Sequence, residues 1–129
     1  MAYEIFAALP LRLALGVAFI VHGYPKLFGP TAKQSRDFMK TVGVPSALTT
    51  LVGLLEFIGG IALLLGFLTQ ITGLLLTLEM IGTTILAKQK LQKKYVLGYE
   101  LDIAYLAGAL SLFFLGGGPF SLDALLTLG

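Results

Sequence analysis

The feature that most constrains this chain is an apolar stretch from Ala47 to Phe67 with one ionisable residue, Glu56, near its middle. A helix of that length is about 31 Å long at about 1.5 Å per residue, which matches a hydrocarbon core about 30 Å thick. The stretch therefore predicts a membrane-spanning helix with a carboxyl group near the bilayer midplane. Ionising that group in lipid costs at least about 2.5 kcal/mol, so the chain must provide a cation, a proton or a protein-lined cavity.

Composition supports a membrane protein throughout. Of the 129 residues 57% are hydrophobic and only 12% are charged, whereas a soluble domain has about a quarter charged residues. The sequence predicts an all-α fold, an integral membrane four-helix bundle that forms a single transmembrane domain over residues 1–129. The expected spans are residues 5–28, 47–67, 71–87 and 99–115. Residues 31–43 are expected to form a helix in the membrane interface or, alternatively, a solvated loop.

Basic residues predict the orientation of the bundle. Eight of the nine Lys and Arg side chains flank the first and third connectors, which lie on the same side of a four-helix protein. Because cytoplasmic loops carry an excess of Lys and Arg, both connectors are expected in the cytoplasm and both termini on the non-cytoplasmic side of the cell membrane. Those residues are Lys26, Lys33, Arg36, Lys40, Lys88, Lys90, Lys93 and Lys94.

Three ionisable residues predict an intramembrane polar pocket: Arg12, Glu56 and Glu79. Counted from the cytoplasmic surface, Glu56 is about 14 Å deep and Glu79 about 12 Å deep, so the two carboxyl groups share a level. Arg12 enters from the opposite surface and is expected to reach down between them. This set has two interpretations. Either Arg12 and Glu56 form a buried pair that fixes the helix register, or the pocket binds a quinone headgroup and passes protons.

A second polar cluster is expected at the cytoplasmic end, formed by His22, Lys26, Glu100 and Asp102. His22 is either a proton relay near neutral pH or a hydrogen-bonded residue at a helix end. With one histidine and no cysteine, no haem or transition-metal site is expected from this chain alone, and dithiol chemistry is excluded. The basic residues lie beside membrane spans without a nucleic-acid-binding motif, so nucleic acid is not an expected partner.

One face of the first span carries small residues at helical spacing. Arg12, Gly16, Phe19, Gly23 and Lys26 follow one another at intervals of four and three residues, which places them on one face. Glycines on such a face let a second helix approach closely. This face is therefore expected to pack against another span.

The order of these features resembles the DoxX family of small four-helix membrane proteins. The matching pieces are residues 11–29, GVP at 43–45, residues 53–69, GYE at 98–100 and GGPFSLD at 117–123. The resemblance covers nearly the whole chain. At these positions the family pattern favours Arg12, Gly16, Gly23, Lys26, Glu56, Gly59, Gly60 and Glu100.

The resemblance implies a partial function. DoxX-like proteins resemble the small quinone-reducing subunit of an archaeal thiosulfate:quinone oxidoreductase, or accompany bacterial oxidoreductase complexes in the membrane. It therefore implies a subunit that binds a quinone or similar lipid-soluble redox molecule, with partner subunits or further copies of itself. The alternatives are a non-catalytic accessory or scaffold subunit and, third, a small carrier. Whether the chain is an enzyme is left open by the sequence.

Overall fold

The computed structural model describes residues 2–127, so Met1, Leu128 and Gly129 of the expected domain lie outside the described residues. Within this range the fold is all-α, with no strand, and four helices are long and apolar enough to cross a membrane. The predicted fold class, a four-helix membrane bundle, is confirmed. The chain is a multi-pass membrane protein.

The four spans are α1, α3, α4 and α5. They comprise Ala8–Leu27 (α1), Ser46–Leu65 (α3), Thr69–Gln89 (α4) and Glu100–Leu115 (α5). A 3-10 turn, Ala2–Phe6, precedes α1, and a distorted π-helical turn, Tyr95–Tyr99, precedes α5. The short helix α2, Pro30–Thr41, fills the first connector, and α6, Leu122–Leu125, follows the last span.

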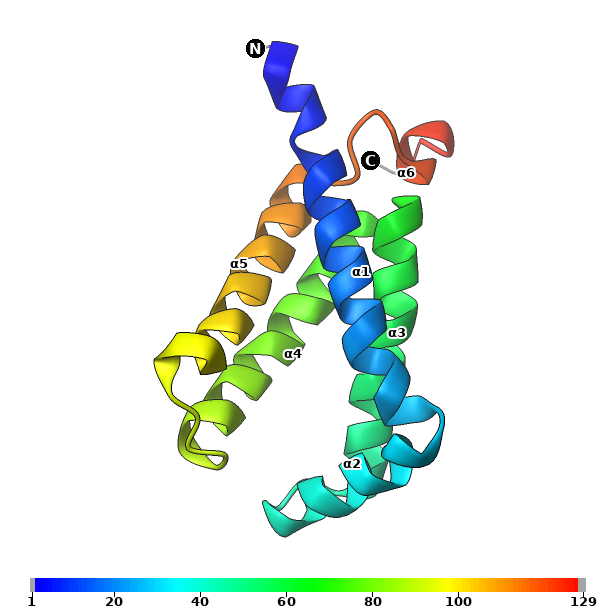
Figure 1. The fold of residues 1–129 in the computed structure, drawn as a ribbon. Coiled ribbons are helices and arrows are strands. Elements are labelled where there is room, and N and C mark those ends of the chain that lie inside the picture. Colours follow the sequence, from blue (N-terminus) through cyan, green and yellow to red (C-terminus); the bar gives the residue numbers. More distant parts are fainter. Residues whose placement is uncertain (1, 128–129) are drawn as a thin grey trace.

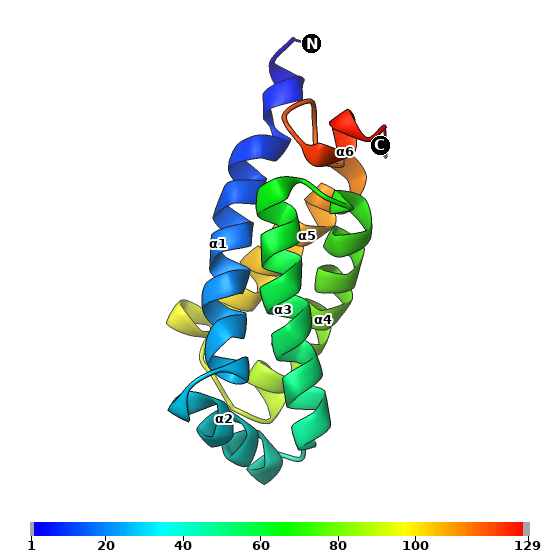
Figure 2. The ribbon, with the colours of Figure 1, turned by 90° about the vertical axis from the view of Figure 1, so that its right-hand side faces the viewer.

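Successive spans run in opposite directions, so the bundle has two distinct ends (Figure 1). The first residues, the α3–α4 turn and α6 gather at one end, here called the terminal end. Helix α2 and the loop between α4 and α5 lie at the other, the connector end, and Figure 2 shows the same division from the side. The two basic connectors thus share one end of the molecule, while their location in the cytoplasm stays a prediction.

Helices α1 and α3 pack closely through glycines. A Cβ on Gly16 would lie 2.9 Å from the carbonyl oxygen of Gly60, and a Cβ on Gly23 would lie 2.8 Å from that of Gly53. Real Cβ atoms do not come so near backbone oxygens, so only glycine permits this separation. The expected packing role of the Gly16 and Gly23 face is therefore confirmed, and the two contacts fix the register of α1 against α3.

A second close pair is α4 and α5. A Cβ on Gly73 would lie 2.8 Å from the carbonyl oxygen of Ala109, so α4 and α5 are in close contact there. A Cβ on Gly82, on the opposite face of α4, would meet nothing within 4 Å. The buried core lies between the two pairs and comprises Ala8, Leu15, Phe19, Leu63, Leu76, Met80, Ala109 and Leu112.

Large apolar side chains on the outer faces of all four spans are exposed, as lipid contact requires. Examples are Val21 at 62% exposed, Leu51 at 60%, Leu78 at 57% and Phe114 at 72%. In water such a surface would be costly, whereas in acyl chains it is the favoured state.

Candidate functional site

Arg12 lies at the terminal end, in a network of backbone carbonyls. Its guanidinium donates four hydrogen bonds of 2.9 to 3.1 Å, to the carbonyl oxygens of Leu63, Leu64, Gly117 and Phe120. The residue is 2% exposed. The predicted contact between Arg12 and Glu56 is therefore wrong. Arg12 instead ties the end of α3 to the segment that follows α5.

The glycine register explains this correction. With Gly16 opposite Gly60, the residue of α3 opposite Arg12 is Leu64, and Glu56 lies eight residues away, about 12 Å along the axis. Helical side chains also lean toward the start of their own helix. In antiparallel α1 and α3, Arg12 therefore leans toward the terminal end and Glu56 toward the connector end, away from each other.

Asp123 completes the terminal network. Its carboxylate accepts hydrogen bonds from the backbone N–H groups of Leu68 and Thr69, at 2.6 and 2.9 Å, and so caps the start of α4. Its own N–H donates to the carbonyl of Gly66, at 2.9 Å. The opposite charges of Arg12 and Asp123 thus lie on either side of the α3–α4 turn, and this cluster holds the helix ends together.

The cation that pairs with Glu56 is Lys26. Its Nζ donates to Oε1 of Glu56 in an ion pair between the last turn of α1 and the middle of α3. The Glu56 side chain is 5% exposed and that of Lys26 is 29% exposed. Glu56 is thus buried and neutralised, as its position in the span requires. The Lys26–Glu56 pair could have been predicted from the sequence. Lys26 lies on the same face of α1 as Arg12, and its side chain points back along the helix toward Glu56.

Glu79 faces this pair from α4. Both of its carboxyl oxygens are buried, and no hydrogen bond of ordinary length reaches them from the described residues, although the carboxyl group of Glu56 lies close enough to interact with them. The charged groups that act on it are Glu56, Lys26 and Asp102, which come from three other helices. The predicted neighbourhood of Glu56 and Glu79 is therefore present. A buried carboxyl group without a partner is costly, and a bound polar group would relieve that cost.

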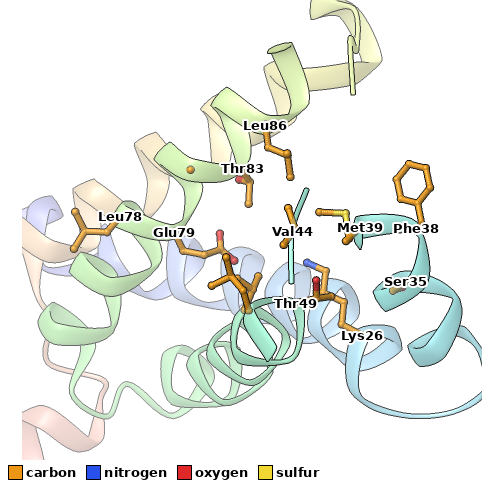
Figure 3. Close-up of a pocket in the computed structure, with 13 residues that line it drawn as sticks. Lys26, Ser35, Phe38, Met39, Val44, Thr49, Leu78, Glu79, Thr83 and Leu86 are labelled. Atoms are coloured by element: carbon orange, nitrogen blue, oxygen red, sulfur yellow. The ribbon is translucent and has the colours of Figure 1, made fainter. Parts of the chain in front are cut away.

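Glu79 lines a pocket of about 450 Å³ between α2, α3 and α4, here called the apolar pocket. Figure 3 shows the side chains of Glu79 and Lys26 pointing into the same space. The rest of the wall is mainly apolar, and several of its side chains, such as Leu78 and Phe38, are also exposed on the outer surface. The residues that line it are Lys26, Ser35, Phe38, Met39, Val44, Leu48, Thr49, Val52, Leu78, Glu79, Gly82, Thr83 and Leu86.

A second pocket of about 310 Å³, here called the charged pocket, lies on the other side of Lys26 and Glu56. Three of the four residues expected in the connector-end cluster line it: His22, Lys26 and Asp102. His22 also lies 3.4 Å from the hydroxyl of Tyr105. Glu100 does not join them, because its Oε1 accepts a hydrogen bond from the Leu97 N–H in the turn before α5.

The three charged side chains can form hydrogen bonds and exchange protons with a polar group. The described residues contain no group of three His, Cys, Asp or Glu side chains placed to hold a metal ion. One cation, Lys26, faces two carboxyl groups. A proton on either carboxyl group would make the set of three neutral, which favours proton exchange within it over free charge in the membrane. The site is thus one cation and two carboxyl groups at the edge of an apolar pocket.

Comparisons with known proteins agree with this membrane architecture. The DoxX family model matches residues 7–89. "Putative oxidoreductase CatD" of Bacillus subtilis is 31% identical to this chain, and the aligned region covers 95% of this chain and 87% of the relative. "Inner membrane protein YqjF" of Escherichia coli is 33% identical, with 95% and 94% covered. "Uncharacterized membrane protein Rv3486" of Mycobacterium tuberculosis is 31% identical, with 88% and 77% covered. No solved structure matches significantly.

Proposed function

We propose that this chain, which belongs to the DoxX family, is a membrane subunit of an oxidoreductase complex and binds a quinone or similar lipid-soluble redox molecule in the apolar pocket. The observation that carries the proposal is Glu79, which lines an apolar pocket of about 450 Å³ and whose buried carboxyl oxygens have no hydrogen bond of ordinary length among the described residues. The relative CatD carries the word oxidoreductase in its name. That name supports oxidation and reduction as the class of reaction.

The residues of the pocket fit such a ligand. Its volume lies within the usual range of small-molecule sites, about 300–1,000 Å³, which are mostly apolar with few polar groups. Lys26 and a protonated Glu79 would donate hydrogen bonds to headgroup oxygens, and Phe38 and Leu78 would contact an apolar tail. A quinone supplies the capacity to take up two electrons and two protons. We propose that a partner subunit delivers the electrons, and that Glu79 holds protons beside the headgroup.

The proposal moves the site that the sequence predicted. Arg12 belongs to the terminal network, so the ligand-binding set becomes Lys26, Glu56 and Glu79. Glu56 would act through Lys26, whose ammonium group it holds in place at the pocket wall. His22 keeps its proposed relay role from the other pocket.

Binding of a short-chain ubiquinone analogue to purified protein tests this proposal. Lys26→Met should weaken binding about tenfold or more, since a hydrogen bond from a charged group contributes about 1.5–3 kcal/mol. Glu79→Leu should weaken it about twofold to tenfold, since a hydrogen bond from a neutral carboxyl group contributes about 0.5–1.5 kcal/mol. Glu100→Leu is the matched control, because Glu100 lies outside both pockets and should leave binding unchanged. If the wild-type protein binds no quinone, or if Glu79→Leu binds as tightly as wild type, the proposal fails.

A further inference from the structure

The two pockets adjoin, because both are lined by Lys26, Met39, Thr83 and Leu86, which are here called the wall. Glu79 lines only the apolar pocket and Glu56 lines only the charged pocket. Glu56 and Glu79 are close enough to interact electrostatically. Each pocket therefore has one carboxyl group beside Lys26, the charged residue common to both linings.

The surroundings of the two pockets differ in polarity. The charged pocket is lined by His22, Lys93 and Asp102 and extends to Leu97 and Gly98 in the loop of the connector end. Lys93 is exposed, and Leu97 is 87% exposed. Such a lining binds water, whereas the lining of the apolar pocket favours acyl chains or an apolar ligand.

We infer that the charged pocket is a water-accessible proton entry from the connector end, and that Glu56 passes protons from it across the wall to Glu79. The delivery of these protons to a bound ligand rests on the proposed function. The water access itself does not. The entry would make proton uptake one-sided, from the face that carries the basic connectors.

The charges around this route permit the transfer. Glu79 faces Glu56 from α3, Lys26 from α1 and Asp102 from α5. Asp102 in turn faces Lys93, His22, Glu56 and Lys26. Because Lys26 reaches both pockets, it can balance the charge on whichever carboxyl group is ionised.

Each step moves one proton and no electrons. The O–H bond of Glu79 breaks as a new O–H bond forms on the ligand oxygen, and Glu79 is left as a carboxylate. Glu56, which is ionised in its pair with Lys26, then takes a proton from hydronium in the charged pocket, leaving water there, and passes that proton to Glu79. Glu56 is again the carboxylate that pairs with Lys26, so the set regains its starting charge.

Because the chain contains no cysteine, single-cysteine variants can test the water access directly. Purified full-length variants in sealed phospholipid vesicles would be treated with a membrane-impermeant cationic methanethiosulfonate, whose sulfur bonds the thiolate while a sulfinate leaves. Leu91→Cys reports on the charged pocket and Gly82→Cys on the apolar pocket, since each residue lines only that pocket and neither is buried. Lys40→Cys marks the connector end, and Tyr3→Cys marks the terminal end, since both side chains are exposed.

We expect Leu91→Cys to react about tenfold faster than Gly82→Cys, and from the same side as Lys40→Cys. Leu101→Cys, in the same lining, replaces Leu91→Cys if that variant does not fold. An unreactive charged pocket, equal rates in the two pockets, or reaction from the side of Tyr3→Cys would overturn the inference. Quinone binding measured on the same preparations separates the failure of this inference from failure of the proposed function.

The proton transfer has its own measurement. A pH step followed by infrared difference spectroscopy detects the carbonyl stretch of protonated carboxyl groups, and Glu79→Gln identifies the Glu79 band. Glu56→Gln should slow the change of that band about tenfold or more, since one carboxyl group of the route is gone. Glu100→Gln, outside both pockets, should leave its rate unchanged. An unchanged rate in Glu56→Gln would show that protons reach Glu79 by another path.

Discussion

Replacing Arg12 tests whether the terminal network supports the fold while the connector end performs the function. Arg12→Met removes four hydrogen bonds to backbone carbonyls and the cation that faces Asp123. Taken at the average of about 0.6 kcal/mol for polar contacts between membrane helices, four bonds contribute about 2.4 kcal/mol. Breaking a buried charged network costs more, about 3–5 kcal/mol, because the remaining partners stay buried and unpaired.

One effect opposes this loss. Methionine removes the desolvation cost of a buried guanidinium, which can make the replacement of a whole ion pair nearly neutral. Here the carbonyls of Leu63, Leu64, Gly117 and Phe120 lose their donor. Asp123 keeps its backbone donors but loses the nearby cation. We therefore expect Arg12→Met to lower the free energy of unfolding by about 3–5 kcal/mol. Arg12→Lys should fall between it and wild type, because an ammonium group lacks the planar fork that reaches several carbonyls at once.

The measurement is unfolding in mixed micelles of dodecyl maltoside and sodium dodecyl sulfate, followed by circular dichroism. The folded fraction of Arg12→Lys should still bind the quinone analogue as wild type does, because Arg12 lines neither pocket at the connector end. If Arg12→Met unfolds at the same detergent fraction as wild type, the structural role assigned to Arg12 is wrong. If Arg12→Lys folds fully but binds no quinone, the ligand site lies elsewhere.

Three further substitutions probe the packing and the site in the same unfolding assay. Gly73→Ala should destabilise the bundle by about 1–3 kcal/mol, because the added Cβ would lie 2.8 Å from the Ala109 carbonyl oxygen, whereas Gly82→Ala, which meets nothing, should be neutral or slightly stabilising. Asp123→Ala should cost about 1–2 kcal/mol through the lost cap of α4, and equal stability would refute that cap. Glu79→Gln should change stability by less than about 1 kcal/mol, since no hydrogen bond is lost, and a large loss would show a structural role.

The spans and their pairing could be predicted because each depends on local pattern. Apolar length fixes a membrane helix whatever its neighbours, and the face that holds Gly16 and Gly23 predicts a close helix contact from spacing alone. The partner of Glu56 depends instead on how far α1 slides along α3, which no single segment determines. Counting residues from the membrane surface places Arg12 within reach of Glu56, because the count ignores the direction in which side chains point along each helix. The role of Asp123 was likewise out of reach, since its partners Leu68 and Thr69 meet it only after the bundle closes.

The location of the site follows from how the helix pairs are joined. At the terminal end the α1–α3 and α4–α5 pairs are tied together, because Arg12 and Asp123 bridge the α3–α4 turn to the segment after α5. Toward the connector end α1 and α3 stay close at Gly23 and Gly53, whereas the apolar pocket lies between α3 and α4 beside Gly82, and both pockets lie there. A charge placed between tightly packed helices could pair but could not meet a ligand or water. The Lys26–Glu56 pair lies beside two cavities, so its charges are paired within the protein and still border space that a ligand or water could occupy.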